Sequence, residues 1–400
     1  MRNQEFNIID FGAQADTIQL QTVAIQACIE ACREAGGGQI TVPTGRFLIG
    51  SLRLYSDMTL YLQAGAQLIG SPNYLDYEDF QVPTTIMYAN DAYYQTKWHL
   101  PPYYFYGLIT AFQAENISII GEPGAVIDGC DTYDANGEEQ FRGPMGIVMS
   151  QVKHLQLIGY TMQNSANWSH CLDGCEQVLI ERVTVQAGHD GFNLHHSRAI
   201  KVQNCHLETG DDCFAGYDIR QLQVTNCQLN TACNVFRVGG HQLVVDNCQI
   251  KGPGRYPHLS QDTYNTHALF KYYSIDVDQM TPVQQDITFQ DCLIDNIGQL
   301  IVYDFGNRNF MQTNRPLDQI NFKRTTINHL TQSSTINGQH LTVSFEKTLI
   351  NFNSKQPFLT FKTPITLKLN EVTFKRPTTI MLANGQQLTL DSQINLIVTK

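Results

Sequence analysis

The stretch NCHLETGDDCFAGYDIRQLQVTNCQLNTACNVFRVGGHQLVVDNCQI, residues 204–250, decides the fold because it repeats itself. An Asn-Cys pair recurs with its cysteine at positions 205, 227 and 248, so the gaps are 22 and 21 residues. An Asp-Cys pair follows at Cys292, two such periods later. Self-similarity at a fixed period of this length is typical of a solenoid, in which each repeat forms one coil.

The same frame continues on both sides of this stretch. LIERVTV (179–185) precedes it by one period, and NFKRTTI (321–327), SFEKTLI (344–350) and KLNEVTF (368–374) extend it. Short alternating apolar runs broken by Gly, Asn and Asp are typical of strands and turns. The sequence therefore predicts an all-β solenoid, a single-stranded parallel β-helix with coils stacked roughly 4.7–4.9 Å apart. The repeated asparagines should form an amide ladder, with the cysteines stacked beside it.

The chain has eleven cysteines, an odd number that favours reduced thiols over a disulfide framework. Structural zinc sites usually include a tight pair of cysteines, and the chain has such pairs only at Cys28/Cys32 and Cys171/Cys175. Free cysteine behaves as a small, buried apolar residue. We therefore expect core positions for the cysteines and predict no metal site.

A solenoid must cover its open ends. Residues 17–35 predict an N-terminal capping helix, with Ile18, Val23 and Cys28 among the residues of its apolar face and a run of three glycines after its end. No second cap can be identified near the C-terminus.

Two segments interrupt the coil rhythm, residues 72–107 and residues 252–273, and both are polar and rich in aromatic residues. Aromatic loops on a rigid scaffold are common binding sites, so Trp98 is a candidate substrate contact. The alternative is that most of these rings pack the loops onto the coils.

The net charge and the hydropathy of the chain exclude some classes of binding partner. A net charge of -11 argues against a nucleic-acid partner and against an anionic membrane surface, although it allows an anionic small substrate. The first residues contain no apolar run of signal-peptide length, and no segment is apolar enough to span a membrane. We therefore expect a cytoplasmic protein. The sequence does not indicate its oligomeric state.

Three aspartates indicate the chemistry. Asp190 stands 21 and 22 residues before the adjacent pair Asp211 and Asp212, so the repeat places all three at one lateral position on adjacent coils. Such a cluster raises the pKa of at least one member and shares its protons. A neutral acid beside ionised carboxylates is suited to cleaving glycosidic bonds. A structural ladder of turn aspartates is the alternative, but a ladder supplies one Asp per coil rather than an adjacent pair.

Several motifs then occur in a characteristic order: the opening segment 6–71, IDG at 127–129, SANWSHCLDGCEQVLIERV at 165–183, Gly-His-Asp at 188–190 and Gly-Asp-Asp at 210–212. In these motifs the sequence resembles polygalacturonases and their relatives, glycoside hydrolase family 28. The resemblance implies a right-handed parallel β-helix and hydrolysis with inversion at the anomeric carbon, without a cofactor. On the matching positions it implies that Asp211 is the general acid and that Asp190 and Asp212 activate water.

The departures from the family concern the substrate. The Asn and Thr that precede the family's first catalytic Asp are replaced by Gly188 and His189, and its Gly-His-Gly falls on residues 232–234, where Cys233 takes the place of the histidine. The family's Arg-Ile-Lys, which grips a uronate carboxylate, has no clear counterpart. A pectic uronate and a neutral or mixed oligosaccharide are therefore equally compatible.

Four further residues are candidates for substrate binding: His189, Arg237, His267 and Lys271. His267 and Lys271 are nearest to the family's uronate-binding motif, and Arg237 lies on the coil after the aspartates and offers an alternative cation. A surface or ladder role is the alternative for each.

Taken together, residues 1–400 predict a single β-helix domain that hydrolyses glycosidic bonds, acting from the ends of short oligosaccharides. The exo action rests on the lack of a signal peptide, which implies imported substrates, and on the 72–107 segment, which would close one end of the cleft. Two alternatives remain: a polysaccharide lyase on the same fold, with calcium and a basic catalytic residue, and a carbohydrate-binding β-helix without catalysis.

Overall fold

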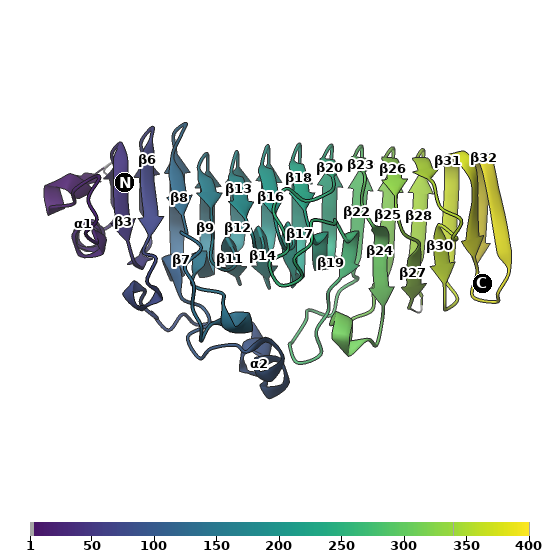
Figure 1. The fold of residues 1–400 in the computed structure, drawn as a ribbon, viewed down its shortest axis with the longest axis horizontal. Coiled ribbons are helices and arrows are strands. Elements are labelled where there is room, and N and C mark those ends of the chain that lie inside the picture. The colour runs from purple at the N-terminus through teal and green to yellow at the C-terminus, as the bar shows by residue number, and fades with distance from the viewer. Residues whose placement is uncertain (1–3, 339, 400) are drawn as a thin grey trace. The chain divides into compact units, whose positions relative to one another are not determined.

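The computed structural model describes residues 4–338 and 340–399, so the two ends of the predicted domain, residues 1–3 and 400, lie outside it. The chain divides into two compact units, Met1–His206 and Leu207–Lys400. Within each unit, parallel strands wind around an axis in successive coils (Figure 1). The predicted all-β solenoid is therefore confirmed, whereas the prediction of one domain stays a prediction.

In the first unit, the coils stack through ladders of aliphatic residues. Ile40 pairs in register with Leu60, Leu60 with Ile119, Ile119 with Leu157 and Leu157 with Ile180, and all five are fully buried. Each such side chain contributes about 1.5–3 kcal/mol through burial, so one repeated position stabilises every coil. The strands are β1 Glu5–Asn7, β2 Gly38–Val42, β3 Gly45–Ile49, β4 Leu52–Arg53, β5 Met58–Leu62, β6 Ala66–Gly70, β7 Gly107–Gly121, β8 Val126–Asp128, β9 Met145–Ile158, β10 Thr161–Gln163, β11 His170–Asp173, β12 Glu176–Glu181, β13 Thr184–Ala187, β14 Phe192–His195 and β15 Arg198–Gln203.

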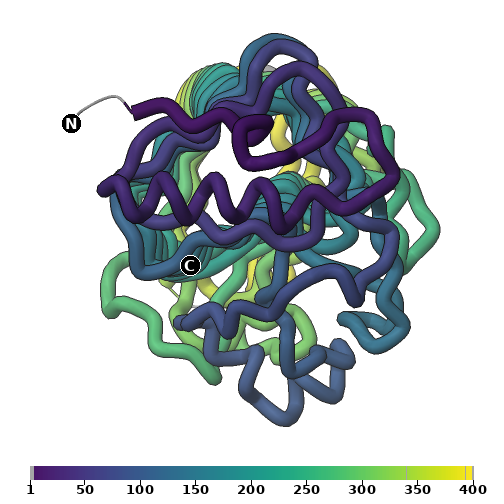
Figure 2. Tube along the Cα trace, turned by 90° about the vertical axis from the view of Figure 1, so that its left-hand side faces the viewer, coloured from purple at the N-terminus to yellow at the C-terminus, as the bar shows by residue number. Residues whose placement is uncertain are grey.

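The predicted capping helix is α1, Thr22–Glu34, and Figure 2 shows it crossing the open end of the first coils. Its buried face consists of Ile25, Cys28, Ile29 and Cys32, at helical spacing. The prediction was wrong for Ile18 and Val23, which are 94% and 84% exposed. The helix begins five residues later than predicted because the preceding residues form a loop.

The first insertion, residues 72–107, contains an α-helix that the sequence analysis did not predict. This helix, α2 (Ala92–Trp98), follows the short 3-10 helices η2 (Tyr74–Asp76) and η3 (Met87–Asn90), and Asp91 caps it by accepting from the backbone of Tyr93 and Tyr94. Two further 3-10 helices in this unit are η1 (Ile8–Phe11) and η4 (Glu138–Gln140). Neither α-helix of the described residues is long and apolar enough to cross a membrane.

In the second unit, aromatic rings stack from coil to coil. Phe289, Phe322 and Phe345 are register partners on β22, β25 and β28, with ring centroids 5.4 and 4.8 Å apart and nearly parallel planes. The strands are β17 Phe214–Thr225, β18 Gln228–Thr231, β19 Asn234–Asp246, β20 Gln249–Lys251, β21 Ala268–Tyr272, β22 Asp286–Gln290, β23 Leu293–Asp295, β24 Gln299–Asp304, β25 Gln319–Lys323, β26 Thr326–Leu330, β27 Ser334–Asn337, β28 Thr342–Glu346, β29 Leu349–Phe352, β30 Leu359–Phe361, β31 Thr366–Met381 and β32 Gln387–Thr399, with η5 at Arg308–Phe310 and β16 (His206–Thr209) at the start of the unit.

The repeated Asn-Cys pair forms the predicted ladder in this unit. The side-chain amide of Asn247 donates to Oδ1 of Asn226 at 2.8 Å. Both asparagines have positive φ, 55° for Asn226 and 49° for Asn247, a conformation that Asn tolerates better than most residues. The cysteines beside them also stack, because the backbone amide of Cys227 donates to Sγ of Cys248 at 3.4 Å. All eleven cysteines are free and ten of them are buried, as expected for apolar filling.

The second insertion is shorter than predicted. It leaves β20 after Lys251 and ends at His267, because residues 268–272 form β21, which pairs in parallel with β19. The insertion therefore returns to the coil at the strand that carries Lys271.

The last coil is followed by a β-hairpin that the sequence analysis did not identify. Strand β31 pairs in parallel with β28, β29 and β30, and it also pairs antiparallel with β32. The yellow strands in Figure 1 form this hairpin, so β32 covers the last coil of the second unit.

Candidate active site

The adjacent carboxyl groups of Asp211 and Asp212 lie in the turn between β16 and β17. Two threonine hydroxyls fix this turn by donating to the backbone carbonyl of Asp211, Thr209 at 2.7 Å and Thr231 from the next coil. The backbone amide of Asp212 donates to Oδ1 of Asp211 at 3.1 Å. The two side chains differ in exposure, with 18% for Asp211 and 1% for Asp212.

Asp212 is held by residues of β19. Oδ1 of Asp212 accepts from the backbone amide of Asn234 at 3.1 Å and from its side-chain amide at 2.8 Å, and Nη1 of Arg237 lies 3.8 Å from Oδ2. Burial, followed by the charge of Asp211, raises the pKa of Asp212, while Arg237 and Asn234 oppose this rise. Two carboxyl groups so close share their protons as a pair, as the sequence predicted.

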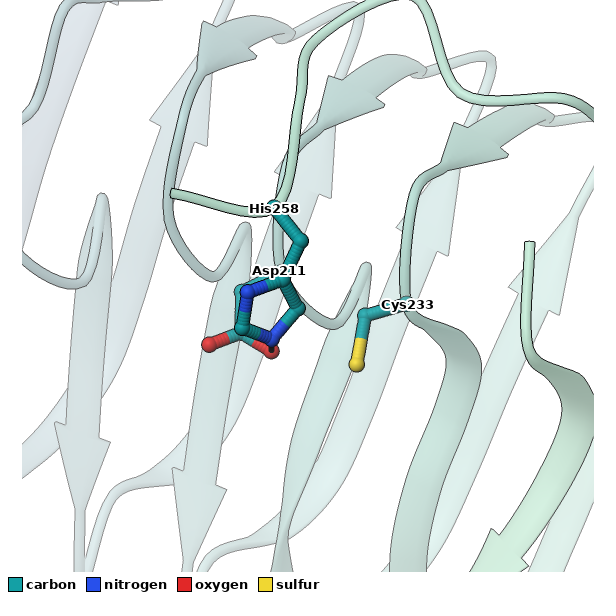
Figure 3. Close-up of side chains that lie close together, drawn as sticks. All are labelled: Asp211, Cys233 and His258. Carbon is teal, nitrogen blue, oxygen red and sulfur yellow. Dashed lines mark ion pairs between the residues drawn. The ribbon is translucent and has the colours of Figure 1, made fainter. Parts of the chain in front are cut away.

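Asp211 lies beside a histidine and a cysteine (Figure 3). Nε2 of His258 is 3.6 Å from Oδ1 of Asp211. Sequence reasoning missed His258, because it lies in an irregular loop where no period marks it. Cys233 occupies the position of the family's histidine, and its Sγ accepts from the side-chain amide of Asn234 at 3.3 Å. Asp211, Cys233 and His258 are also the residues of this unit whose donor atoms are close enough to hold a metal ion.

Three predicted substrate-binding residues lie around this pair. Arg237 and Lys271 are register neighbours on β19 and β21. The guanidinium of Arg237 lies over the ring of Tyr273 at 4.4 Å, and Nζ of Lys271 lies 5.1 Å from the ring of Phe310. Burial first, and then the charge of Arg237, lowers the pKa of Lys271. Nδ1 of His267 is 3.8 Å from Sγ of Cys233. The unit therefore places two cations and an imidazole beside the carboxyl pair.

The other predicted catalytic residue, Asp190, belongs to the first unit. It is 5% exposed and accepts a hydrogen bond from the side-chain amide of Asn193 at 2.5 Å. Oδ1 of Asn193 in turn lies 3.1 Å from Nε2 of His195. His189 is also buried, with its ring stacked on Phe141 at 5.8 Å. The approach of Asp190 and His189 to the carboxyl pair stays a prediction.

Trp98 packs against its own insertion. Its ring stacks on Tyr94 at 4.9 Å and meets the edge of Tyr88 at 5.3 Å. A pocket of about 390 Å³ lies in the same insertion, and its lining includes Tyr103, Tyr104 and Phe105. Trp98, Tyr88 and Tyr94 therefore pack against one another, and substrate contact by Trp98 stays a prediction.

The first unit also contains a buried acid that the sequence analysis missed. Glu138 is 8% exposed and accepts from the hydroxyl of Tyr104 at 3.0 Å and the side-chain amide of Asn167 at 3.1 Å. Burial is the main cause of the raised pKa of Glu138. Glu138 and its neighbour Glu139 give no sequence signal between β8 and β9, since the burial of Glu138 depends on residues 29 and 34 positions away.

Comparisons with known proteins identify the family of the chain. The sequence model of the glycosyl hydrolases family 28 matches residues 32–376. An exo-poly-alpha-D-galacturonosidase of Dickeya chrysanthemi is 51% identical over 73 residues, which are 18% of this chain and 12% of that protein. A probable polygalacturonase of Vitis vinifera is 25% identical over 218 residues, 52% of this chain and 43% of that protein. The chain thus matches less than half the length of each of these relatives.

A solved structure extends the likeness to nearly the whole chain. The hyperthermoactive exopolygalacturonase of Thermotoga maritima superposes with a TM-score of 0.71 at 16% identity, covering 99% of this chain and 96% of that one. At this identity the likeness shows the fold, a right-handed parallel β-helix.

Proposed function

The chain belongs to the glycosyl hydrolases family 28, as its motifs predicted, and we propose that it hydrolyses glycosidic bonds by an inverting acid–base mechanism. The family implies a polysaccharide or oligosaccharide substrate. The observation that carries the proposal is the pair Asp211 and Asp212, one partly exposed and one buried with a raised pKa.

In the proposed mechanism, Asp211 donates a proton to the leaving oxygen of the glycosidic bond. Its partial exposure suits this role, because the acid must reach the substrate. Asp212, with Asp190, accepts a proton from the attacking water. Its raised pKa makes the carboxylate of Asp212 a stronger base, and the two hydrogen bonds from Asn234 limit that rise. An inverting mechanism requires about 6.5–9.5 Å between the acid and the base, so that water fits between them.

The proposed substrate is a short pectin-type oligosaccharide, cleaved from one end. Arg237 and Lys271 support an acidic sugar, since two partly exposed cations beside the carboxyl pair would bind a uronate carboxylate. The local likeness to an exo-poly-alpha-D-galacturonosidase supports exo action.

The test is sugar release from a panel of pectic and neutral oligosaccharides by the wild type and two variants. Asp211→Asn keeps the shape of the side chain and removes the acid, so hydrolysis should fall by roughly 10²–10⁴-fold. Asp262→Asn is the matched control, because Asp262 is exposed in the second insertion and has a φ of 47° that Asn tolerates, so its activity should equal that of the wild type.

The outcome also separates the alternatives. Release of a single monosaccharide by the wild type supports an exo-hydrolase, whereas a mixture of longer products would contradict exo action. An unsaturated product that absorbs in the ultraviolet would indicate a lyase instead. Binding without any product from the whole panel would indicate a carbohydrate-binding protein.

A further inference from the structure

Asp211 and two residues beside it form an unusual combination of possible metal ligands. Asp211, Cys233 and His258 each offer one donor atom, and these three atoms lie within 4.8 Å of one another. They come from three separate segments, the turn before β17, the turn before β19 and the second insertion. Figure 3 shows the thiol and the imidazole beside the carboxylate.

Carboxylate oxygen, cysteine sulfur and imidazole nitrogen are the ligands that zinc prefers. With zinc–ligand distances of about 2.0–2.3 Å, neighbouring donors of a tetrahedral site lie roughly 3.3–3.8 Å apart. The 3.6 Å between Nε2 of His258 and Oδ1 of Asp211 fits one such edge. Nδ1 of His267 lies 3.8 Å from Sγ of Cys233, beside the three donors but outside their group.

The ring of His258 is buried and directs Nε2 at Asp211, which leaves Nδ1 on the far edge of the ring. The residue is 6% exposed, and its Nδ1 has no hydrogen-bond partner within the described part of the chain. Buried polar atoms of this kind are rare, since a buried nitrogen normally has a partner. The ring lies nearly parallel to that of His267, at 6.2 Å between centroids. The two imidazoles therefore stack loosely beside the donor group.

Two cationic side chains are neighbours of these donors. Arg237 pairs with Asp212, and Lys271, which lies against the ring of Phe310, also acts electrostatically on Asp211 and Cys233. A carboxylate and a thiolate together balance the charge of one divalent ion. The remaining donor is an imidazole, which binds a metal ion in its neutral form.

We propose that Asp211, Cys233 and His258 bind a zinc-class divalent cation as its three protein ligands. Binding transfers the proton of the Cys233 thiol to solvent and leaves the thiolate on the ion. The ion also occupies Asp211, so it blocks proton donation to the leaving oxygen and inhibits hydrolysis. This inhibition rests on the proposed function, whereas the binding of the ion does not.

Cobalt(II) titration of the reduced, chelator-treated full-length chain tests the binding without any substrate. We expect one cobalt ion per chain, with the absorption of a tetrahedral site and a near-ultraviolet thiolate-to-cobalt band, both removed by one equivalent of zinc. Absence of the thiolate band in the wild type would overturn the proposal, whatever the enzyme hydrolyses.

Variants locate the site. Cys233→Ser should lose the thiolate band, and His258→Asn should weaken cobalt binding by at least about 10-fold. Cys130→Ser is the matched control, because Cys130 is the cysteine that is not buried and so is the most accessible thiol for adventitious binding. Loss of the band in Cys130→Ser, or its persistence in Cys233→Ser, would contradict the assignment. The loop variant His258→Asn keeps the test decisive if Cys233→Ser fails to fold.

The inhibition is tested on the substrate found for the wild type. Saturating zinc should abolish hydrolysis by the wild type and should inhibit Cys233→Ser only at concentrations at least about 10-fold higher. Full activity of a wild type whose cobalt spectrum shows the site occupied would overturn the inhibitory role.

Discussion

At the scale of single residues, the carboxyl pair shows how environment separates two identical groups. Asp212 is enclosed by Asn234 and Arg237, whereas Asp211 keeps part of its surface and faces His258. Adjacent positions in a turn point in different directions, so one member enters the packed coil and the other faces the insertion. The different roles proposed for the two aspartates follow from this difference.

Arg237→Gln tests the acidic-substrate proposal. A hydrogen-bonded ion pair to a uronate contributes about 1.5–3 kcal/mol, so the KM for an oligogalacturonate should rise roughly 10- to 100-fold. Steady-state kinetics on a charged and a neutral oligosaccharide measure this, and the neutral one serves as the internal control. An equal loss on both substrates would mean that Arg237 acts through Asp212 rather than on the sugar.

His170 should make stability depend on pH. Its Nδ1 lies 3.0 Å from the carbonyl of Gly191, its Nε2 lies 2.9 Å from the hydroxyl of Tyr160, and burial lowers its pKa to about 4. The unfolded chain, with an ordinary histidine pKa of about 6.5, binds the proton first as the pH falls. Stability is therefore complete above pH 6.5 and declines towards pH 4, by up to about 3 kcal/mol.

Thermal unfolding between pH 7 and pH 4 checks this expectation. His170→Gln should show a shallower decline than the wild type. The control is His329→Gln, whose side chain is 63% exposed and which should follow the wild-type curve. Parallel curves for all three proteins would contradict the assignment to His170.

At the scale of the elements, the residue before each repeated core position, at the corner of the coil, keeps the same backbone conformation from coil to coil, while its side chain changes. Asn226 and Asn247 occupy it in the early coils of the second unit, and Asp291, Arg324 and Lys347 take the same left-handed conformation later, with φ of 53°, 47° and 48°. The amide ladder becomes an ion pair, since Arg324 donates to both carboxylate oxygens of Asp291 at 2.8 and 2.6 Å. The corner thus requires a conformation more than a residue type.

Asn247→Ala measures that requirement. Alanine in the left-handed region costs about 1–2 kcal/mol, and the amide bond to Asn226 is also lost. Asn247→Gly loses the same bond but accepts the conformation, so it should be the less destabilised variant. Urea denaturation gives both free energies of unfolding, and equal values would show that strain has no part in the corner.

The sequence predicted the coils because stacking repeats one environment at each period. It did not predict His258 or Glu138, since both lie in irregular segments where burial depends on residues distant in sequence. The start of α1 was wrong for a local reason. The side chain of the buried Gln21 bonds Thr17 and the carbonyl of Gln19, and these contacts hold the preceding residues in a loop.

At the scale of the whole molecule, a stack of coils stays free of association only if the strand edges at its ends are covered. Helix α1 buries Ile29 against the first coils, whereas Val23 on the same helix faces solvent. Ile29→Asp places a charge in that contact and should release the helix, which exposes strand edges that can pair with another chain.

Light scattering after size-exclusion chromatography measures the consequence. Ile29→Asp should self-associate with increasing concentration. Val23→Asp adds the same charge to the exposed face and should keep the mass of the wild type. A variant Ile29→Asp with unchanged mass would show that α1 is not needed to protect the end of the stack.

The second insertion leaves the coil after Lys251 and rejoins it at Ala268, and β19 and β21 pair in parallel across this interruption. The pairing of the coils therefore does not depend on the length of the insertion, although the insertion carries His258 and His267. A gene that gains or loses codons between these two points exchanges the imidazoles around Asp211 while every coil keeps its partner. Such a scaffold can acquire new chemistry through insertions and deletions as readily as through point substitutions.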